Sequence, residues 1–129
     1  MKKIRRFLIL WGPAVLWMII IFVFSSRPSI AVAETPLFNF LVFKFLHMVE
    51  YAILFLLILR ANKKNGKITQ KMFFYSLLIS ILYAVSDEIH QTFVPTREGR
   101  IRDVLIDTAG IAIMYMYIKG RPKALAKII

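Results

Sequence analysis

The stretch FLILWGPAVLWMIIIFVF, residues 7–24, contains no charged side chain over 18 consecutive positions. At a rise of about 1.5 Å per residue, a helix of this length crosses most of a hydrocarbon core about 30 Å thick. The whole chain is similarly apolar, with 59% hydrophobic residues and a mean hydropathy of +0.67. Because soluble domains contain only about 45–50% apolar residues, lipid must be the solvent for most of these side chains, and a soluble globular protein is excluded.

Three further apolar segments follow at residues 37–59, 72–90 and 103–118. The last is the shortest and covers only about 24 Å as a helix, so we expect it to begin in the headgroup region or to thin the bilayer locally. The sequence therefore predicts an all-α membrane protein, a bundle of four transmembrane helices that forms a single domain over residues 1–129.

The first apolar segment also imitates a secretory signal, because a basic start and an apolar run lead to Ala31-Val32-Ala33. The apolar region of a signal peptide is usually about 7–15 residues long, which is shorter than the run found here. We therefore expect this segment to be retained as the first transmembrane helix.

Segments rich in basic residues alternate along the chain with segments that contain few of them. Thirteen of the 18 Lys and Arg residues lie at the N-terminus, in the loop around residues 60–71 or in the C-terminal tail, and four lie in the other two loops. Cytoplasmic loops of membrane proteins carry the excess of Lys and Arg. We therefore predict a multi-pass protein of the cell membrane with both termini in the cytoplasm. The same distribution accounts for the net charge of +11 without a nucleic-acid partner.

Almost all acidic residues and both histidines lie inside or at the edge of apolar segments. They are His47, Glu50, Asp87, Glu88, His90, Asp103 and Asp107, whereas Glu34 and Glu98 lie in ordinary loops. An ionised side chain at the centre of a bilayer costs about 2.5–3.5 kcal/mol on insertion scales, so such residues tend to be paired, inward-facing and functional. These seven residues are the candidate catalytic residues.

Helical spacing places these groups on shared faces. In the second segment Lys44, His47 and Tyr51 share one face, with Glu50 at its border. The third segment carries a stripe of Ser76, Ser80, Tyr83, Asp87, His90 and Gln91, and the fourth a stripe of Asp103, Asp107, Gly110, Met114 and Tyr117. We expect three helices to direct these stripes at one site that opens toward the outside, although serines and glycines of this kind also commonly serve only as packing seams.

Three arginines, Arg97, Arg100 and Arg102, lie on the side of the membrane where basic residues are otherwise sparse. The planar guanidinium group suits phosphate and carboxylate, although the three could equally be solvated or paired with the acids nearby. The candidate ligand-binding residues are Lys44, Tyr51, Gln91, Arg97, Arg100 and Arg102. The expected partner is an anionic lipid headgroup.

The spacings leave the chemistry open. His47-x-x-Glu50 and Glu88-x-His90 are usable for metal ligands, but neither is a strong catalytic signature, and histidines can also carry protons near neutral pH. Because four basic side chains lie close to five acids, we expect ion pairing to satisfy most of the site, with no tightly bound metal and no cofactor. The absence of cysteine excludes disulfides and thiolate chemistry.

Two motifs carry a resemblance to a known family. The first is KFLHMVEY at residues 44–51, and the second is SDEIHQTFVP at residues 86–95, which continues through Arg97 to the paired aspartates and Gly110. Over residues 44–110 the chain resembles the VanZ-like family, except that Thr96 stands where that family commonly has glycine. The resemblance implies a small bacterial integral membrane protein of a family named for a teicoplanin-resistance protein.

Three hypotheses for function remain. The first is a membrane protein that engages an anionic envelope lipid or glycolipid at the outer leaflet and so changes how lipoglycopeptide antibiotics meet the cell, which would link it to teicoplanin resistance. The second is a membrane-embedded lipid hydrolase or transferase that uses the Asp, Glu and His residues. The third is a structural module whose ion pairs hold the bundle together. The sequence predicts neither the oligomeric state nor whether a reaction is catalysed.

Overall fold

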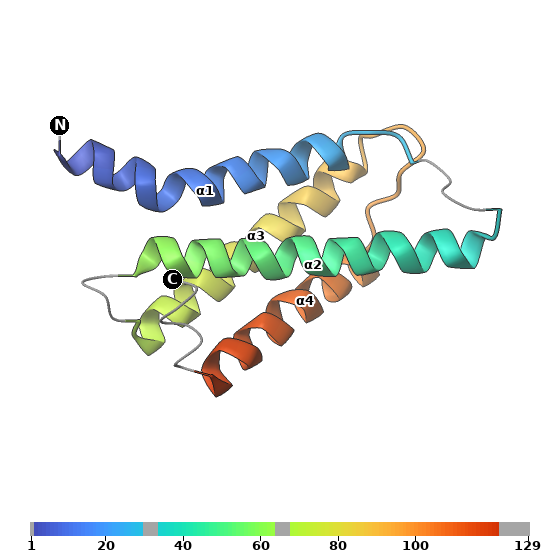
Figure 1. Cartoon of the computed structure of the whole chain (residues 1–129). Helices are drawn as coiled ribbons and strands as arrows, with labels where there is room; N and C mark the ends of the chain where they lie inside the picture. The colour runs from blue at the N-terminus through green and yellow to red at the C-terminus, as the bar shows by residue number, and fades with distance from the viewer. Residues whose placement is uncertain (1, 30–33, 64–67, 122–129) are drawn as a thin grey trace.

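The computed structural model describes residues 2–29, 34–63 and 68–121, which form four α-helices (Figure 1). These are α1 (Lys2–Ser25), α2 (Pro36–Asn62), α3 (Gln70–Gln91) and α4 (Ile101–Gly120). The prediction of an all-α protein with four helices is confirmed. Each helix extends beyond its predicted range at both ends, because the apolar run marks only the part of a helix that meets hydrocarbon.

Three of the four helices can cross a membrane by length and composition, namely α1, α2 and α3. The fourth, α4, is 20 residues long but carries Arg102, Asp103, Asp107 and Lys119, and it is not among the candidate spans. The fourth transmembrane helix therefore stays a prediction. The motif Ala31-Val32-Ala33 and the basic residues at positions 64, 67, 123 and 127 lie outside the described residues.

α2 is the central helix, since it packs against α1, α3 and α4, most extensively against α4. Its second half forms the core, where Tyr51, Phe55 and Leu59 are fully buried. Ala84 of α3 and Ile111 of α4 belong to the same apolar cluster. The helices that flank α2 therefore cover one half of it almost completely.

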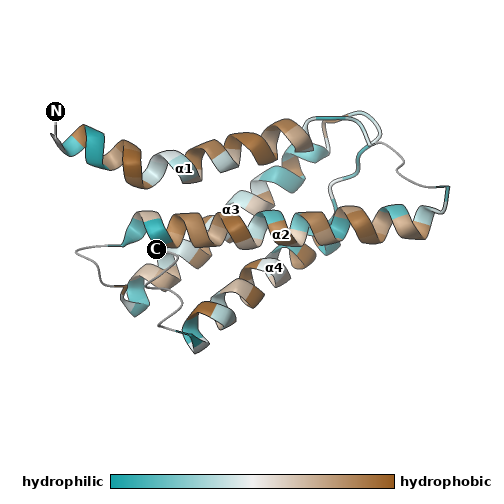
Figure 2. Cartoon of the chain, in the orientation of Figure 1, coloured by the Kyte–Doolittle hydropathy of each residue, from teal (hydrophilic) through white to brown (hydrophobic). Residues whose placement is uncertain are grey.

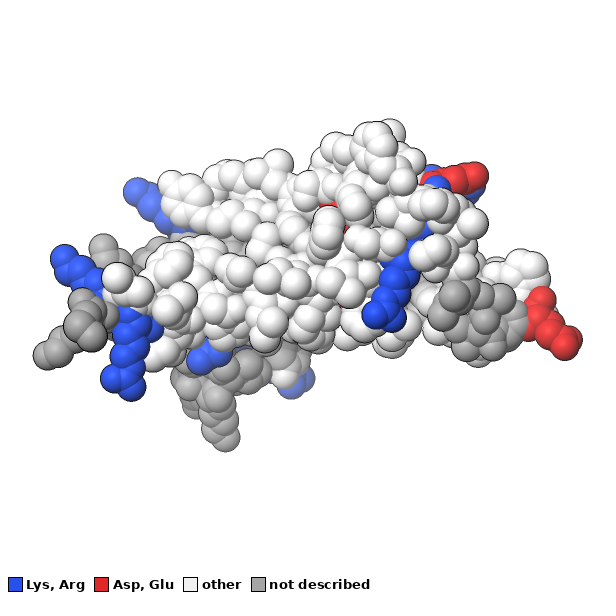
Figure 3. Space-filling model, turned by 90° about the horizontal axis from the view of Figure 1, so that it is seen from above, with Lys and Arg blue, Asp and Glu red and all other residues white. Residues whose placement is uncertain are grey.

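Outside this core, apolar side chains face outward. Phe7, Leu16 and Phe45 are among many large hydrophobic residues that are exposed, and hydrophobic residues dominate long stretches of α1 and α2 (Figure 2). Lys and Arg residues mark both ends of the face seen in Figure 3, while its middle is nearly free of charge. This surface is the one expected of a protein surrounded by lipid.

α2 and α4 approach each other most closely at Gly110. A β-carbon at this position would overlap the backbone of Met48 on α2, so only glycine allows the two helices to approach each other this closely. Small residues often permit such close packing in membrane bundles, where contact between helices must replace the hydrophobic driving force. The contact brings the aspartates of α4 beside the polar residues of α2.

Candidate functional site

The α1–α2 and α3–α4 connections meet at the end of the bundle opposite the N-terminus (Figure 1). The backbone N–H of Ser29 donates to Oγ1 of Thr96 at 3.0 Å, and the Ser29 hydroxyl donates to the Thr96 carbonyl at 3.1 Å. Thr96 has a φ of 65°, a left-handed conformation that β-branched residues rarely adopt. A glycine, which the family resemblance leads one to expect at this position, would adopt this backbone without strain, whereas the threonine side chain here joins the two connections.

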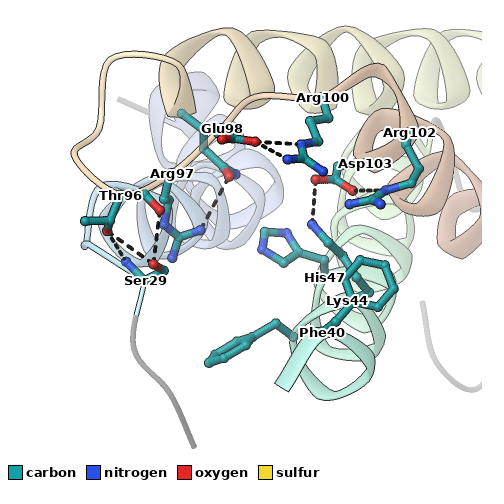
Figure 4. A pocket seen from close by; sticks show the side chains of 12 residues that line it. Ser29, Phe40, Lys44, His47, Thr96, Arg97, Glu98, Arg100, Arg102 and Asp103 are labelled. Carbon is teal, nitrogen blue, oxygen red and sulfur yellow. Dashed lines mark hydrogen bonds and ion pairs between the residues drawn. The ribbon is translucent and has the colours of Figure 1, made fainter. Parts of the chain in front are cut away.

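A cavity of about 650 Å³ lies beneath these connections (Figure 4), within the range of about 300–1,000 Å³ that is usual for ligand sites. Its charged lining residues and histidine are Lys44, His47, Arg97, Glu98, Arg100, Arg102 and Asp103. Four of these side chains are cationic and two are carboxylates, so the cavity is positively charged when the histidine is neutral. We call it the cationic cavity.

Ion pairs satisfy part of this charge. Asp103 is shared by two cations, because Nζ of Lys44 lies 2.7 Å from its Oδ2 and Nε of Arg102 donates to its Oδ1 at 3.2 Å. Arg100 pairs with Glu98 within the connection itself, and hydrogen bonding to that carboxylate raises the pKa of the Arg100 guanidinium. One aspartate therefore ties α2 to α4 while it leaves two basic groups to share a single negative charge.

Arg97 is held differently. Its Nε donates to the carbonyl of Arg27 at 2.7 Å, Nη2 to the carbonyl of Phe24 at 3.3 Å and Nη1 to Oε1 of Gln91 at 3.4 Å. Gln91 in turn donates from Nε2 to Oδ2 of Asp87 at 3.1 Å. Within residues 2–29, 34–63 and 68–121, no carboxylate forms an ion pair with Arg97. Neutral oxygens fix this guanidinium while its charge stays available to an anion.

Buried acids lie behind the cationic cavity. Asp107 is only 1% exposed, and Oε2 of Glu88 accepts the backbone N–H of Arg100 at 3.0 Å. Nδ1 of His47 lies 3.8 Å from both Oδ1 of Asp107 and Oε2 of Glu50, which is too long for a hydrogen bond. This nitrogen and Oδ2 of Asp107 are buried without a hydrogen-bond partner among the described residues. Since buried polar atoms are usually paired, the interior beside His47 has unused hydrogen-bonding capacity.

The acids do not converge as metal ligands usually do. In the part of the chain that the structure describes, no group of three His, Asp or Glu side chains is arranged to hold a metal ion. The expectation that the protein binds no metal tightly stays a prediction.

A second cavity of about 510 Å³ adjoins the first, between the end of α1 and the first half of α2. Its lining is mainly apolar, with Phe24, Pro28, Phe43 and Leu46 among its residues. Glu50, which the sequence predicted as part of the polar core, lines this second cavity instead of the first. We call it the apolar cavity.

The other candidate residues are divided between the cationic cavity and its surroundings. Gln91 lines that cavity, whereas Tyr51 is fully buried in the core. His90 turns toward α1, where its Nε2 is 2.9 Å from the hydroxyl of Ser26 and its ring packs 4.6 Å from that of Phe22. Asp87 and His90 differ by about 60° around the helix axis, which is enough for one to face α2 and the other to face α1.

Sequence reasoning missed the contribution of α1 and of the aromatic residues. Phe40 and Phe43 line the cationic cavity beside Lys44, and their spacing from Lys44 and His47 could have revealed the shared face. Arg27 lines the apolar cavity, although the sequence analysis counted it only as a loop charge. No sequence signal showed that the carbonyl groups at the end of α1 orient Arg97.

These features define a multi-pass α-helical membrane protein, with three candidate spans and a positively charged cavity at one end. The chain belongs to the VanZ/LLP1 family, since the model of that family matches residues 10–124. The match confirms the family that residues 44–110 suggested and extends it into α1 and through α4. Comparison with curated proteins and with solved structures gave no match.

Proposed function

We propose that this protein binds the anionic headgroup of an envelope lipid or glycolipid in the cationic cavity. The observation that carries the proposal is Arg97, a guanidinium fixed by neutral oxygens with no carboxylate partner among the described residues. Lys44 and Arg102 add positive charge because they share a single carboxylate. Phosphate oxygens match the planar donors of arginine, and their attraction is stronger where protein and lipid exclude water.

The proposed orientation has both termini in the cytoplasm, α4 as a fourth crossing and the cationic cavity at the outer leaflet. It is supported by the basic residues that lie at the opposite end, such as Lys63, Lys71 and Arg121. Since the chain lacks cysteine, single cysteines can test it. A cysteine at Glu98 should react with an impermeant thiol reagent in intact cells, and one at Lys71 should react only after lysis. The reverse pattern would place the cavity at the cytoplasmic face.

Lipid binding is tested with Arg97→Gln and the control Lys71→Gln, which removes a similar charge at the other end of the bundle. The proteins are placed in phosphatidylcholine nanodiscs with increasing phosphatidylglycerol, and retained lipid is measured by native mass spectrometry. Wild type and Lys71→Gln should retain phosphatidylglycerol preferentially. Arg97→Gln should bind phosphatidylglycerol at least about tenfold more weakly than wild type, which is the equivalent of one charge-assisted hydrogen bond. A wild type without preference for phosphatidylglycerol would overturn the proposal.

The proposed cellular consequence is altered access of lipoglycopeptide antibiotics to the envelope. It is supported by the resemblance to a family named for teicoplanin resistance and by the proposed location of the cavity at the outer leaflet. Cells that express wild-type protein should tolerate more teicoplanin than cells that express equal amounts of Arg97→Gln. Equal teicoplanin tolerance of the two strains would contradict the proposed link between lipid binding and resistance.

A second candidate function is a lipid hydrolase or transferase, and His47 is the observation that favours it. This histidine lines both cavities, and its Nδ1 lies 3.8 Å from a carboxylate oxygen of Asp107 and of Glu50. A small movement on ligand binding would shorten either separation to the hydrogen bond that orients a general base. Incubation of the nanodisc complex followed by lipid mass spectrometry distinguishes the two functions. An enzyme would convert bound lipid and lose conversion but not binding in His47→Gln, whereas a binder would return the lipid unchanged.

A further inference from the structure

We infer that the apolar cavity holds a hydrocarbon chain of the same lipid whose headgroup occupies the cationic cavity, so that the ligand is a chain-bearing anionic amphiphile and not a free anion. This inference rests on the proposed function. It adds a second compartment to the site and assigns α1 to ligand recognition.

The two cavities are neighbours that share part of their walls. Phe43, His47 and Arg97 line both of them. On one side of these residues the lining carries the basic groups of α2, α4 and the α3–α4 connection, and on the other side it is mainly apolar. A single ligand that fills both spaces must therefore be anionic at one end and apolar at the other.

Positive charge is concentrated where the two compartments meet. Arg97 binds the carbonyl groups of Phe24 and Arg27 at the end of α1. Arg27 also lines the apolar cavity, and its guanidinium lies 5.3 Å from the centre of the Phe24 ring. The phosphate of a phospholipid stands between a polar headgroup and its chains, so it would meet these two arginines while the chain continues past Phe24.

The surroundings of the apolar cavity fit a chain that enters from the membrane. The cavity lies between α1 and α2, both of which are candidate spans. Leu46 lines it and is about half exposed on the surface of α2. Because a chain that moves from lipid into an apolar groove gains little hydrophobic free energy, the groove would select the shape and position of the ligand, while the headgroup supplies most of the affinity.

Blocking the groove tests this inference. Leu46→Trp places a larger side chain in the lining, and Phe45→Trp makes the same substitution at the next residue of α2, which is exposed and lines neither cavity. Two probes are used: phosphatidylglycerol in phosphatidylcholine nanodiscs, and soluble glycerol phosphate, which has no chain. Leu46→Trp should retain at least about fivefold less phosphatidylglycerol, as expected when a filled site excludes a ligand, and should bind glycerol phosphate like wild type. Phe45→Trp should change neither.

The same experiment separates the two proposals. If Leu46→Trp retains phosphatidylglycerol like Phe45→Trp while Arg97→Gln loses it, the chain inference is overturned and the proposed function stands. If Arg97→Gln also retains it, the proposed function is overturned and the inference with it. If Leu46→Trp has a lower melting temperature than Phe45→Trp, its loss of lipid could reflect instability, and the inference is then tested on the wild-type protein. Dihexanoyl phosphatidylglycerol, which is soluble, should then bind at least about tenfold more tightly than glycerol phosphate, and equal affinities would overturn the inference.

Discussion

The two halves of α2 have opposite surroundings. Between Tyr51 and Asn62, side chains at intervals of three and four residues are buried against the other helices. Between Pro36 and Glu50, no side chain is buried. The first half instead contributes Lys44 and His47 to the cationic cavity. One helix thus provides a packed half that holds the bundle together and an open half that forms the site.

The boundary between the two halves is held by α1. The indole N–H of Trp17 donates to the carbonyl of Glu50 at 2.9 Å, and the hydroxyl of Tyr83 on α3 donates to the carbonyl of Met18 at 2.6 Å. Interhelical hydrogen bonds of this kind are common in membrane bundles. Because α1 is bonded to both α2 and α3 just below the site, the open half can keep its cavities without collapse.

The largest effect is expected in the packed half. Phe55→Ala removes a fully buried ring and should lower the free energy of unfolding by up to about 3–5 kcal/mol, the range for soluble cores, with a smaller value where lipid replaces water as the reference. Lipid binding per folded molecule should not change. The matched variant Phe45→Ala, at an exposed position of the open half, should stay within about 0.5 kcal/mol of wild type. Denaturant titration of both checks this, and equal losses would contradict the division of α2.

An intermediate effect is expected at the ion pairs of the open half. Asp103→Asn leaves both Lys44 and Arg102 without their carboxylate, whereas Lys44→Gln leaves Asp103 paired with Arg102. The lysine and aspartate side chains are 20% and 7% exposed. Asp103→Asn should therefore lower the free energy of unfolding by an amount between that of an exposed ion pair, about 0–1 kcal/mol, and that of a broken buried pair, about 3–5 kcal/mol. The loss for Lys44→Gln should be smaller.

The same two variants and their double mutant, measured by thermal unfolding, test the structural-module hypothesis. If lipid retention survives in each variant in proportion to its folded fraction, the ion pairs serve only to hold the bundle. If retention falls while unfolding is nearly unchanged, these charges belong to the binding site.

A smaller effect is expected at Thr96. Thr96→Ala removes the two hydrogen bonds that Ser29 donates to Oγ1 of Thr96, but keeps the one to the backbone carbonyl and the left-handed backbone. The free energy of unfolding should therefore fall by about 0.5–1.5 kcal/mol for each net hydrogen bond lost. Thr96→Gly loses the same bonds but also removes backbone strain of order 1–3 kcal/mol, so it should be close to wild type. Melting temperatures compare the two. An alanine variant as stable as the glycine variant would show that the positive φ of 65° carries no cost.

The smallest expected effect is that of metal ions. Because ion pairs and hydrogen bonds engage Asp87, Glu88 and Asp103, the protein should melt at the same temperature in EDTA and in millimolar magnesium or manganese. A cation that bound only the folded state at about 100 times its dissociation constant would stabilise it by about 2.7 kcal/mol. A clear rise that Asp107→Asn abolishes would favour the enzyme hypothesis.

The sequence was sufficient for the features that depend on one helix at a time. Apolar runs predicted four helices, three of which are candidate membrane spans. The spacing of Lys44 and His47 predicted a shared face, which lines the cationic cavity. The three arginines of the α3–α4 region line the same cavity, as their position after α3 suggested. Such features follow from composition and from helical periodicity, which are local properties of the chain.

Features that depend on contact between distant segments were not readable. His90 shares a predicted stripe with Asp87 but meets Ser26, which is 64 positions earlier in the chain. Periodicity indicates the direction of a side chain around its own helix and leaves open which neighbour occupies that direction. For the same reason the sequence did not show that Glu50, whose Oε2 lies 3.8 Å from Nδ1 of His47, also lines the apolar cavity.

By itself the sequence determined a membrane-embedded, all-α protein of the VanZ/LLP1 family, because the hydropathy of each segment and the residues of the two motifs do not depend on how the helices pack. Only the tertiary structure decided that α2 would be packed along one half and open along the other. It also decided that the end of α1 would hold Arg97 in place and that two cavities would share a wall. The physical reason is that these properties arise from the close approach at Gly110 and from hydrogen bonds between helices, which exist only once the bundle is assembled.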